Sequence, residues 1–213
     1  IAPWTMQVTG DLQPCVGDTE SYSVEALDGA GIYHWFLDGV LIAQTPNNTL
    51  NQMWDAPGTY ELCIDASNDP CVPITDAPAP LCVTIVVHEA EAGLLDVSAS
   101  PLCLNEISAI SSTGYNPGVD NAQIILITDA AGNIVFVINA EAGSFTSATS
   151  GTFTIYAYNY IASIGIIPTI GMNISELDCG SACCDLESQT ITFQNIEAEV
   201  TNINCNNNGT DDD

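Results

Sequence analysis

The chain contains no lysine and no arginine, whereas 27 of its 213 residues are aspartate or glutamate, which gives a formal charge of −27. Salt bridges made by lysine or arginine therefore cannot stabilise any fold of this chain. Hydrophobic residues make up 46% of the sequence, so a buried core can form despite the high net charge. We expect the fold to be held by apolar burial, hydrogen bonds and covalent crosslinks.

The same charge excludes two classes of partner. Nucleic acids are bound mainly through cationic side chains that displace counterions from the phosphates. Anionic membrane surfaces attract proteins through the same side chains. The sequence therefore predicts neither nucleic-acid binding nor binding to anionic membranes.

Nine cysteines are present, and their spacing argues against a zinc site. No paired CxxC units with the spacing of a zinc finger occur, and the two histidines, His34 and His88, lie far from most of the cysteines. Disulfides that form in an oxidising compartment explain such a count better. The sequence therefore predicts an extracellular protein, located at a cell surface.

Strand signals dominate the sequence. Short runs rich in Val, Ile, Thr and Tyr alternate with clusters of Gly, Pro, Asn and Asp, as in β-sandwiches. We expect strands at residues 21–26, 32–37, 59–66, 82–87, 123–128, 134–138, 152–158 and 189–194. Asp38-Gly39 predicts a hairpin turn, and no stretch shows a sustained helical period. The predicted class is all-β, with tandem immunoglobulin-like sandwiches arranged like beads on a string.

A weak internal repeat indicates how the chain is divided. Residues 4–9 lead to Cys15, residues 94–98 lead to Cys103, and residues 197–201 lead to Cys205. Two of these segments are followed by similar strands, at residues 58–62 and 151–155. We predict a first module over residues 1–88, a second over 94–194, and the first strand of a third, truncated module over 196–213. The short joints favour a semi-rigid rod.

A set of short segments gives the first module a family resemblance: residues 15–19, 22–24, 33–36, Trp54, 57–60 and Cys63. These segments resemble the PKD-like repeats of giant surface adhesins of Bacteroidota, which are exported by the type IX secretion route. Residues 143–145 and 151–160 of the second module, and the closing stretch 202–213, resemble other repeats of those arrays. The resemblance implies surface filaments that serve adhesion, gliding or prey capture.

From these features we predict a non-catalytic structural or adhesive segment of a long extracellular filament. Its partners would be other copies or modules of the same filament, or a cell-surface or glycan target. The alternative is a carbohydrate-binding or accessory module of a secreted hydrolase, with Trp4 or a group of tyrosines as an aromatic platform.

No catalytic residues stand out. No Gly-x-Ser-x-Gly elbow accompanies the histidines, and no cation is present to stabilise an oxyanion. No cofactor is expected, although calcium at the module joints is an alternative, because carboxylates supply the hard oxygen ligands that Ca²⁺ prefers. The candidate ligands are Glu89, Glu91 and Asp96, and Asp211, Asp212 and Asp213 in the tail.

Side-chain alternation suggests pairings for the cysteines of the first module. In two neighbouring antiparallel strands, Cys63 and Cys82 would both face solvent and lie opposite each other. Cys15 would then pair with Cys71 in the intervening loop. The rival arrangement joins Cys15 to Cys63 and Cys71 to Cys82, like the bridge between the sheets of an antibody domain.

Cysteines that are adjacent in sequence seldom bridge each other, so Cys183 and Cys184 of the second module should have different partners. Cys103 should therefore reach Cys183 or Cys184, and Cys179 should take the other. Cys205 is left over, and its partner would lie in the third module.

Tyr156, Tyr158 and Tyr160 form the candidate contact surface. If Phe153, Ile155 and Ala157 point into the core, alternation places these tyrosines in a stripe on the opposite face. Exposed aromatic stripes mark contact surfaces. The alternative is that the segment after them, residues 161–174, covers the stripe.

Overall fold

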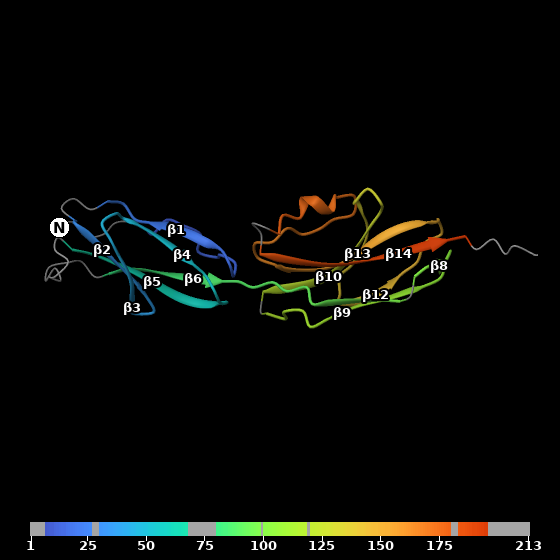
Figure 1. Ribbon diagram of the computed structural model, residues 1–213, viewed down its shortest axis with the longest axis horizontal. Coiled ribbons are helices and arrows are strands. Elements are labelled where there is room, and N and C mark those ends of the chain that lie inside the picture. Colours follow the sequence, from blue (N-terminus) through green and yellow to red (C-terminus); the bar gives the residue numbers. More distant parts are fainter. Residues whose placement is uncertain are drawn as a thin grey trace, which may run out of the picture.

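The computed structural model describes residues 7–26, 30–67, 80–98, 100–118, 120–179 and 183–195. Within these ranges the chain forms two β-sandwiches that lie end to end along the long axis of the molecule (Figure 1). The helical structure in them is limited to one 3₁₀ turn, η1 (Ile174–Glu176). The predicted all-β, immunoglobulin-like class is confirmed, whereas the array remains a prediction.

Sandwich 1 precedes His88 and packs a two-stranded sheet against a four-stranded one. The smaller sheet pairs β1 (Thr19–Ser23) with β4 (Thr49–Met53). The larger has the order β3-β2-β5-β6 and consists of β2 (Ile32–Leu37), β3 (Val40–Thr45), β5 (Gly58–Ser67) and β6 (Leu81–Val87). The turn between β2 and β3 has positive φ at Asp38 and Gly39, as a tight hairpin requires.

Aromatic and branched side chains fill the space between these sheets. Trp35 and Tyr22 are fully buried, and Trp54 donates a hydrogen bond from Nε1 to Tyr22 Oη (3.1 Å). On β5, Leu62 and Ile64 face this core while Glu61 is exposed. The period of two in this strand therefore matches the core face of the sheet, although Cys63, on the opposite face, is also buried.

Sandwich 2 packs a three-stranded sheet against a five-stranded one. The three-stranded sheet has the order β12-β9-β7 and contains β7 (Leu94–Val97), β9 (Ser108–Thr113) and β12 (Ala142–Phe145). The five-stranded sheet has the order β11-β10-β13-β14-β8. It contains β8 (Leu102–Cys103), β10 (Asn121–Thr128), β11 (Ile134–Ile138), β13 (Gly151–Ile161) and β14 (Cys184–Gln194).

The central strands of the five-stranded sheet, β10 and β13, are covered on both faces. Ile125, Ile155 and Phe193 point between the two sheets. On the opposite face, Leu126 and Tyr158 belong to a separate apolar cluster, which the segment after β13 covers (Figure 1). Strands covered on both sides need apolar residues at successive positions, which explains the uninterrupted apolar run in β10.

The described residues contain no helix with the length and apolar character needed to cross a membrane.

Candidate functional site

The candidate site is the joint between the sandwiches, defined here as residues 88–93 together with Cys15 and Cys183. On the side of sandwich 1, the N-terminal segment runs beside the end of β6. Val86 donates its N–H to Leu12 O, His88 to Pro14 O, and Val16 to His88 O, each at 2.9 Å. Cys15 and His88 thereby form a parallel bridge, so the N-terminal segment reaches the joint.

On the side of sandwich 2, side chains hold the linker backbone. Asn159 of β13 is fully buried, and its Oδ1 accepts a hydrogen bond from Glu91 N (3.2 Å). Asp185 Oδ2 accepts from Ala92 N (2.9 Å), while Ser112 Oγ donates to Ala92 O (2.8 Å). The linker is therefore bound through its own peptide groups, as buried backbone requires.

Further amides complete this network. Asn116 and Asn121 each donate from Nδ2 to Glu89 O, at 2.9 and 2.8 Å. Asn159 Nδ2 donates to Gln123 Oε1 (3.0 Å), and Gln123 Nε2 in turn donates to Ala92 O (3.2 Å). Sequence reasoning missed these residues. The sequence did contain a signal for them, because Asn159 and Gln123 are amide side chains inside apolar strands. An unpaired polar group is costly there, so such residues are expected to have hydrogen-bond partners.

A disulfide crosses the joint. Cys15 of sandwich 1 is bonded to Cys183, which immediately precedes β14 of sandwich 2; the Cα atoms are 5.4 Å apart and the residues 168 positions apart in sequence. This corrects both predicted partners of Cys15, Cys71 and Cys63. Those predictions assumed that every bond stays within one module, whereas the N-terminal segment delivers Cys15 to the boundary. Cys71 lies outside the described residues.

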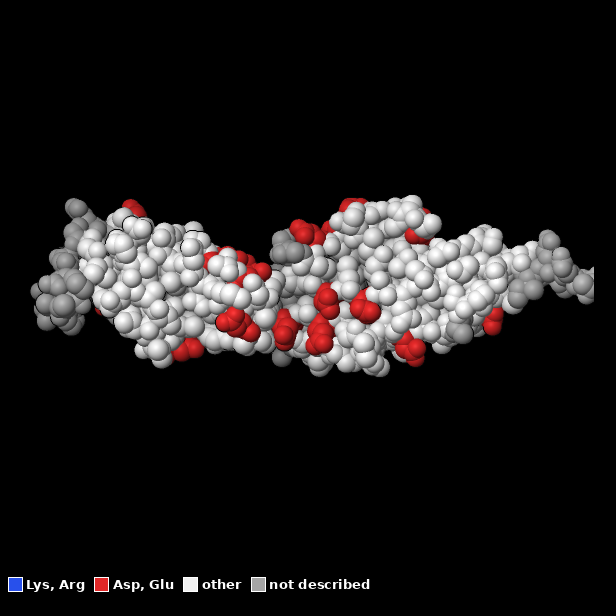
Figure 2. All heavy atoms as spheres, viewed as in Figure 1, with Lys and Arg blue, Asp and Glu red and all other residues white. Residues whose placement is uncertain are grey.

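A cavity of about 260 Å³ lies beside this bond. Its lining comes from both sandwiches: Cys15, Val16, Asp18, His88, Glu89, Ala90, Cys179, Cys183 and Cys184. Nε2 of His88 is buried and makes no hydrogen bond with any described residue. Figure 2 shows Asp and Glu side chains gathered around the joint on the face in view. The surroundings of the joint are thus anionic.

The other cysteines of sandwich 2 also differ from the expected pairs. Cys179 is bonded to Cys184, so neither Cys183 nor Cys184 is left for Cys103. Cys103 is an exposed free cysteine, which corrects its predicted disulfide. It lies in β8, beside the last residue of β14, at the opposite end of that strand from Cys183. Cys205 lies outside the described residues.

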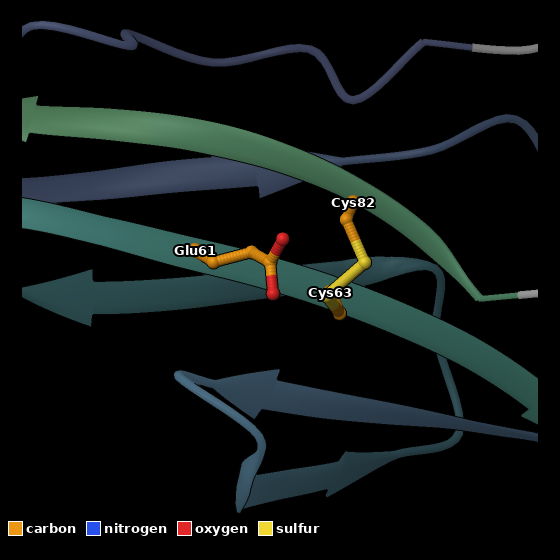
Figure 3. Close-up of side chains that lie close together, drawn as sticks. All are labelled: Glu61, Cys63 and Cys82. Carbon is orange, nitrogen blue, oxygen red and sulfur yellow. A yellow bond between two sulfur atoms is a disulfide. The ribbon is translucent and has the colours of Figure 1, made fainter.

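Within sandwich 1, Cys63 and Cys82 are bonded across neighbouring strands and are direct partners in the β5–β6 register. This is the pairing that side-chain alternation favours. Glu61 lies beside the bond (Figure 3). These three residues are the only group of three or more potential metal ligands found in the described ranges. Because both sulfurs are in a disulfide, they are not available as the thiolates that bind metals.

The joint carboxylates predicted as calcium ligands are not brought together in such a group. Glu89, Glu91 and Asp96 are all exposed, and none belongs to a cluster of three or more ligands within the described ranges. Residues 211–213 lie outside those ranges.

The predicted contact surface is wrong, because the alternative arrangement occurs. Tyr158 is fully buried and Tyr160 is 8% exposed. Tyr156 is partly buried against the same apolar cluster. Tyr158 donates its hydroxyl hydrogen to Ile166 O (3.0 Å), so the segment after β13 covers the stripe. The tyrosines therefore offer no platform for a glycan, and Trp4 lies outside the described residues.

No protein-family model and no curated protein matches the chain. Solved structures do. The fibronectin(III)-like modules of Clostridium thermocellum CbhA match over 91% of this chain and 97% of theirs, with 13% identity and a TM-score of 0.42. The C-terminal fragment of intimin, solved in complex with the intimin-binding domain of its receptor, matches over 72% of this chain and 59% of the fragment, with 13% identity and a TM-score of 0.44.

The BSP domain of a biofilm-associated protein matches over 90% of this chain and 30% of that one, with 13% identity and a TM-score of 0.29. All three TM-scores are below 0.5. The fold class therefore rests on the strands and sheets of this chain itself.

Proposed function

We propose that the chain is a non-catalytic, load-bearing segment of a long extracellular surface filament or adhesin. The observation that carries this proposal is the covalent bond between the sandwiches, Cys15–Cys183. A bond inside one sandwich stabilises that sandwich alone, whereas this one resists separation or bending of the two units. Such a joint suits a spacer that must stay extended.

The position of the bond defines a path for tension. The segment from Gln7 lies along sandwich 1 and ends at Cys15 beside the joint. Beyond the bond, β14 runs from Cys184 at the joint toward the other end of sandwich 2 (Figure 1). Tension applied at the two chain termini would pass along these segments and through the disulfide. The 168-position stretch between the bonded cysteines would therefore carry no tension.

Composition supports an extracellular setting. Disulfides persist in oxidising compartments and are rare in a reducing cytosol. The absence of lysine and arginine also denies cleavage sites to proteases that cut after these residues. Both properties fit a filament exposed outside the cell.

We also propose that residues 1–88 and 94–194 are successive modules of an array and that 196–213 begins a third. The array would be of the PKD-like type found in type IX-secreted adhesins, with other modules or copies of the filament, or a cell-surface or glycan target, as partners. In support, sandwiches 1 and 2 have separate apolar cores and are joined by only a short linker.

Single-molecule force spectroscopy on the chain held by its two ends tests the load-bearing role. The oxidised chain should stop extending once the segments outside the Cys15–Cys183 bond are taut. A Cys15→Ser, Cys183→Ser variant should extend by on the order of 500 Å more, since an extended chain spans about 3.5 Å per residue.

The matched control is Cys63→Ser with Cys82→Ser, which removes a disulfide inside sandwich 1 and leaves the joint bond intact. It should stop at the wild-type length. If the oxidised wild-type chain extends as far as the Cys15→Ser, Cys183→Ser variant, the bond carries no load and the proposal fails.

A further inference from the structure

The free cysteine of sandwich 2 stands in the same local structure as the cysteine that bonds across the joint. Cys15 N donates to Asp18 Oδ2 (2.9 Å), and Asp18 N donates back to Cys15 O (3.1 Å). In sandwich 2, Cys103 N donates to Glu106 Oε2 (2.8 Å), and Glu106 N donates to Cys103 O (3.1 Å). Each cysteine thus begins a turn closed by an acidic residue three positions later.

The backbone of the two turns agrees as well. The residue two positions after each cysteine has positive φ: Gly17 at 93° and Asn105 at 63°. Glycine and asparagine are the residues that adopt this left-handed region most readily. The two turns are therefore alike in hydrogen bonds and in backbone conformation.

Their places in the sandwiches are equivalent. Cys15 forms a parallel bridge with His88, the residue directly after β6, which is the last strand of sandwich 1. Cys103 pairs in parallel with Gln194, the final residue of β14, which is the last strand of sandwich 2. Each cysteine therefore marks the end of its sandwich from which the chain leaves.

The two cysteines differ in bonding. Cys15 is bonded to the sandwich that follows it. Cys103 is exposed and free, at the end of sandwich 2 where the chain continues to Asn195. The eleven residues of β14 separate it from the first joint by about 35 Å, at about 3.3 Å per residue. No cysteine of the first joint can reach it across that distance.

We propose that Cys103 is the attachment site for a second joint, in which it forms a disulfide with a cysteine of the next sandwich. This inference rests on the proposed function, since it requires a following module. Cys183, the partner of Cys15, directly precedes the last strand of its sandwich. The partner of Cys103 is therefore a cysteine directly before the last strand of the next sandwich.

Cys205 is not that partner. In the sequence repeat it follows residues 197–201 as Cys15 follows residues 4–9 and Cys103 follows residues 94–98. In sequence it is thus the counterpart of Cys15 and Cys103, not of Cys183.

The bond forms by oxidation of two thiols. Cys103 and its partner each lose a proton and together lose two electrons as the S–S bond forms. The electrons and protons pass by thiol–disulfide exchange to a disulfide-bearing oxidoreductase of the oxidising compartment, which is reduced to its dithiol.

Peptide mapping by mass spectrometry under non-reducing conditions tests the proposal on two samples, each treated first with N-ethylmaleimide. In the purified 213-residue chain, Cys103 should be labelled and Cys15 should not. In the parent polypeptide taken from intact cells, Cys103 should be unlabelled and linked to a peptide from the following sandwich.

A labelled Cys103 in the cellular material would overturn the proposal, as would a bond to Cys205 in either sample. The proposed load-bearing function is judged separately, by the force measurement on the Cys15–Cys183 bond, so the two can fail independently. A Cys103→Ser variant of the 213-residue chain should show the same extension as wild type, because this thiol has no disulfide partner among the described residues.

Discussion

Asn159 sits at the centre of the hydrogen bonds that hold the linker to sandwich 2. Its side chain accepts from Glu91 N and Asn121 Nδ2 and donates to Asn116 O and Gln123 Oε1. The residue is fully buried. Its substitution would leave several buried polar groups without partners.

We expect Asn159→Ala to lower the free energy of unfolding by about 1–3 kcal/mol, the usual cost of unsatisfied buried polar groups. Urea unfolding measures this, and hydrogen exchange at the Glu91 amide should become faster. Asn51→Ala, at an exposed position of β4, is the control and should change stability by at most about 0.5 kcal/mol. Equal losses in the two variants would contradict a special role for Asn159.

The segment that follows β13 acts as a cover for one face of the five-stranded sheet. Ile166, Met172 and Leu177 pack on the cluster that contains Tyr158, and the Cys179–Cys184 bond ties the end of the cover to the start of β14. Burial raises the pKa of Tyr158 to about 12, with a contribution from neighbouring Tyr160. The ionisation of this phenol therefore reports whether the cover is closed.

Cys179→Ser with Cys184→Ser should loosen the cover and move the pKa of Tyr158 back toward 10. Absorbance at 295 nm, read against a Tyr158→Phe version of the same variant, follows the titration. Tyr22 in sandwich 1 is the internal control: its pKa is also raised to about 12, mainly by burial, and should not change. An unchanged pKa for Tyr158 would show that packing alone holds the cover.

These two tyrosines also make stability depend on pH in the alkaline range. A phenol with a folded-state pKa near 12 and an unfolded-state pKa near 10 binds more protons in the folded state between these values. Its stabilising contribution is complete below pH 10 and is lost as the pH rises toward 12.

The whole molecule is an elongated polyanion without lysine or arginine. Its acidic side chains gather partly around the joint (Figure 2), where the two sandwiches meet. At pH 7 the formal charge is −27, so repulsion opposes the compact state. The disulfide and hydrogen bonds of the joint act against this repulsion.

Raising sodium chloride from about 10 to 500 mM should therefore raise the thermal unfolding midpoint at pH 7, because salt shortens the screening length from about 30 Å to a few Å. At about pH 3, roughly one unit below the usual carboxyl pKa values of about 4, most of the 27 carboxylates are protonated, so the net charge is close to zero and the salt effect should be small. Differential scanning calorimetry at both pH values checks this. Equal salt effects at the two pH values would rule out net charge as the cause.

Local features were readable from the sequence because they depend on neighbouring residues. The period of two in residues 59–65 placed Leu62 in the core and Cys63 opposite Cys82, as the β5–β6 register has them. Asp38-Gly39 marked the hairpin turn because few other pairs tolerate its backbone. The strand-rich pattern and the absence of a helical period determined the all-β class.

The tertiary structure alone decided which distant segments meet. The bond from Cys15 to Cys183 joins residues 168 positions apart, and alternation within a strand carries no information about the neighbouring sandwich. The burial of Tyr158 likewise depended on where the chain goes after β13. Both outcomes follow from how the segments are arranged in space, which is governed by packing between elements rather than by the preferences of any one of them.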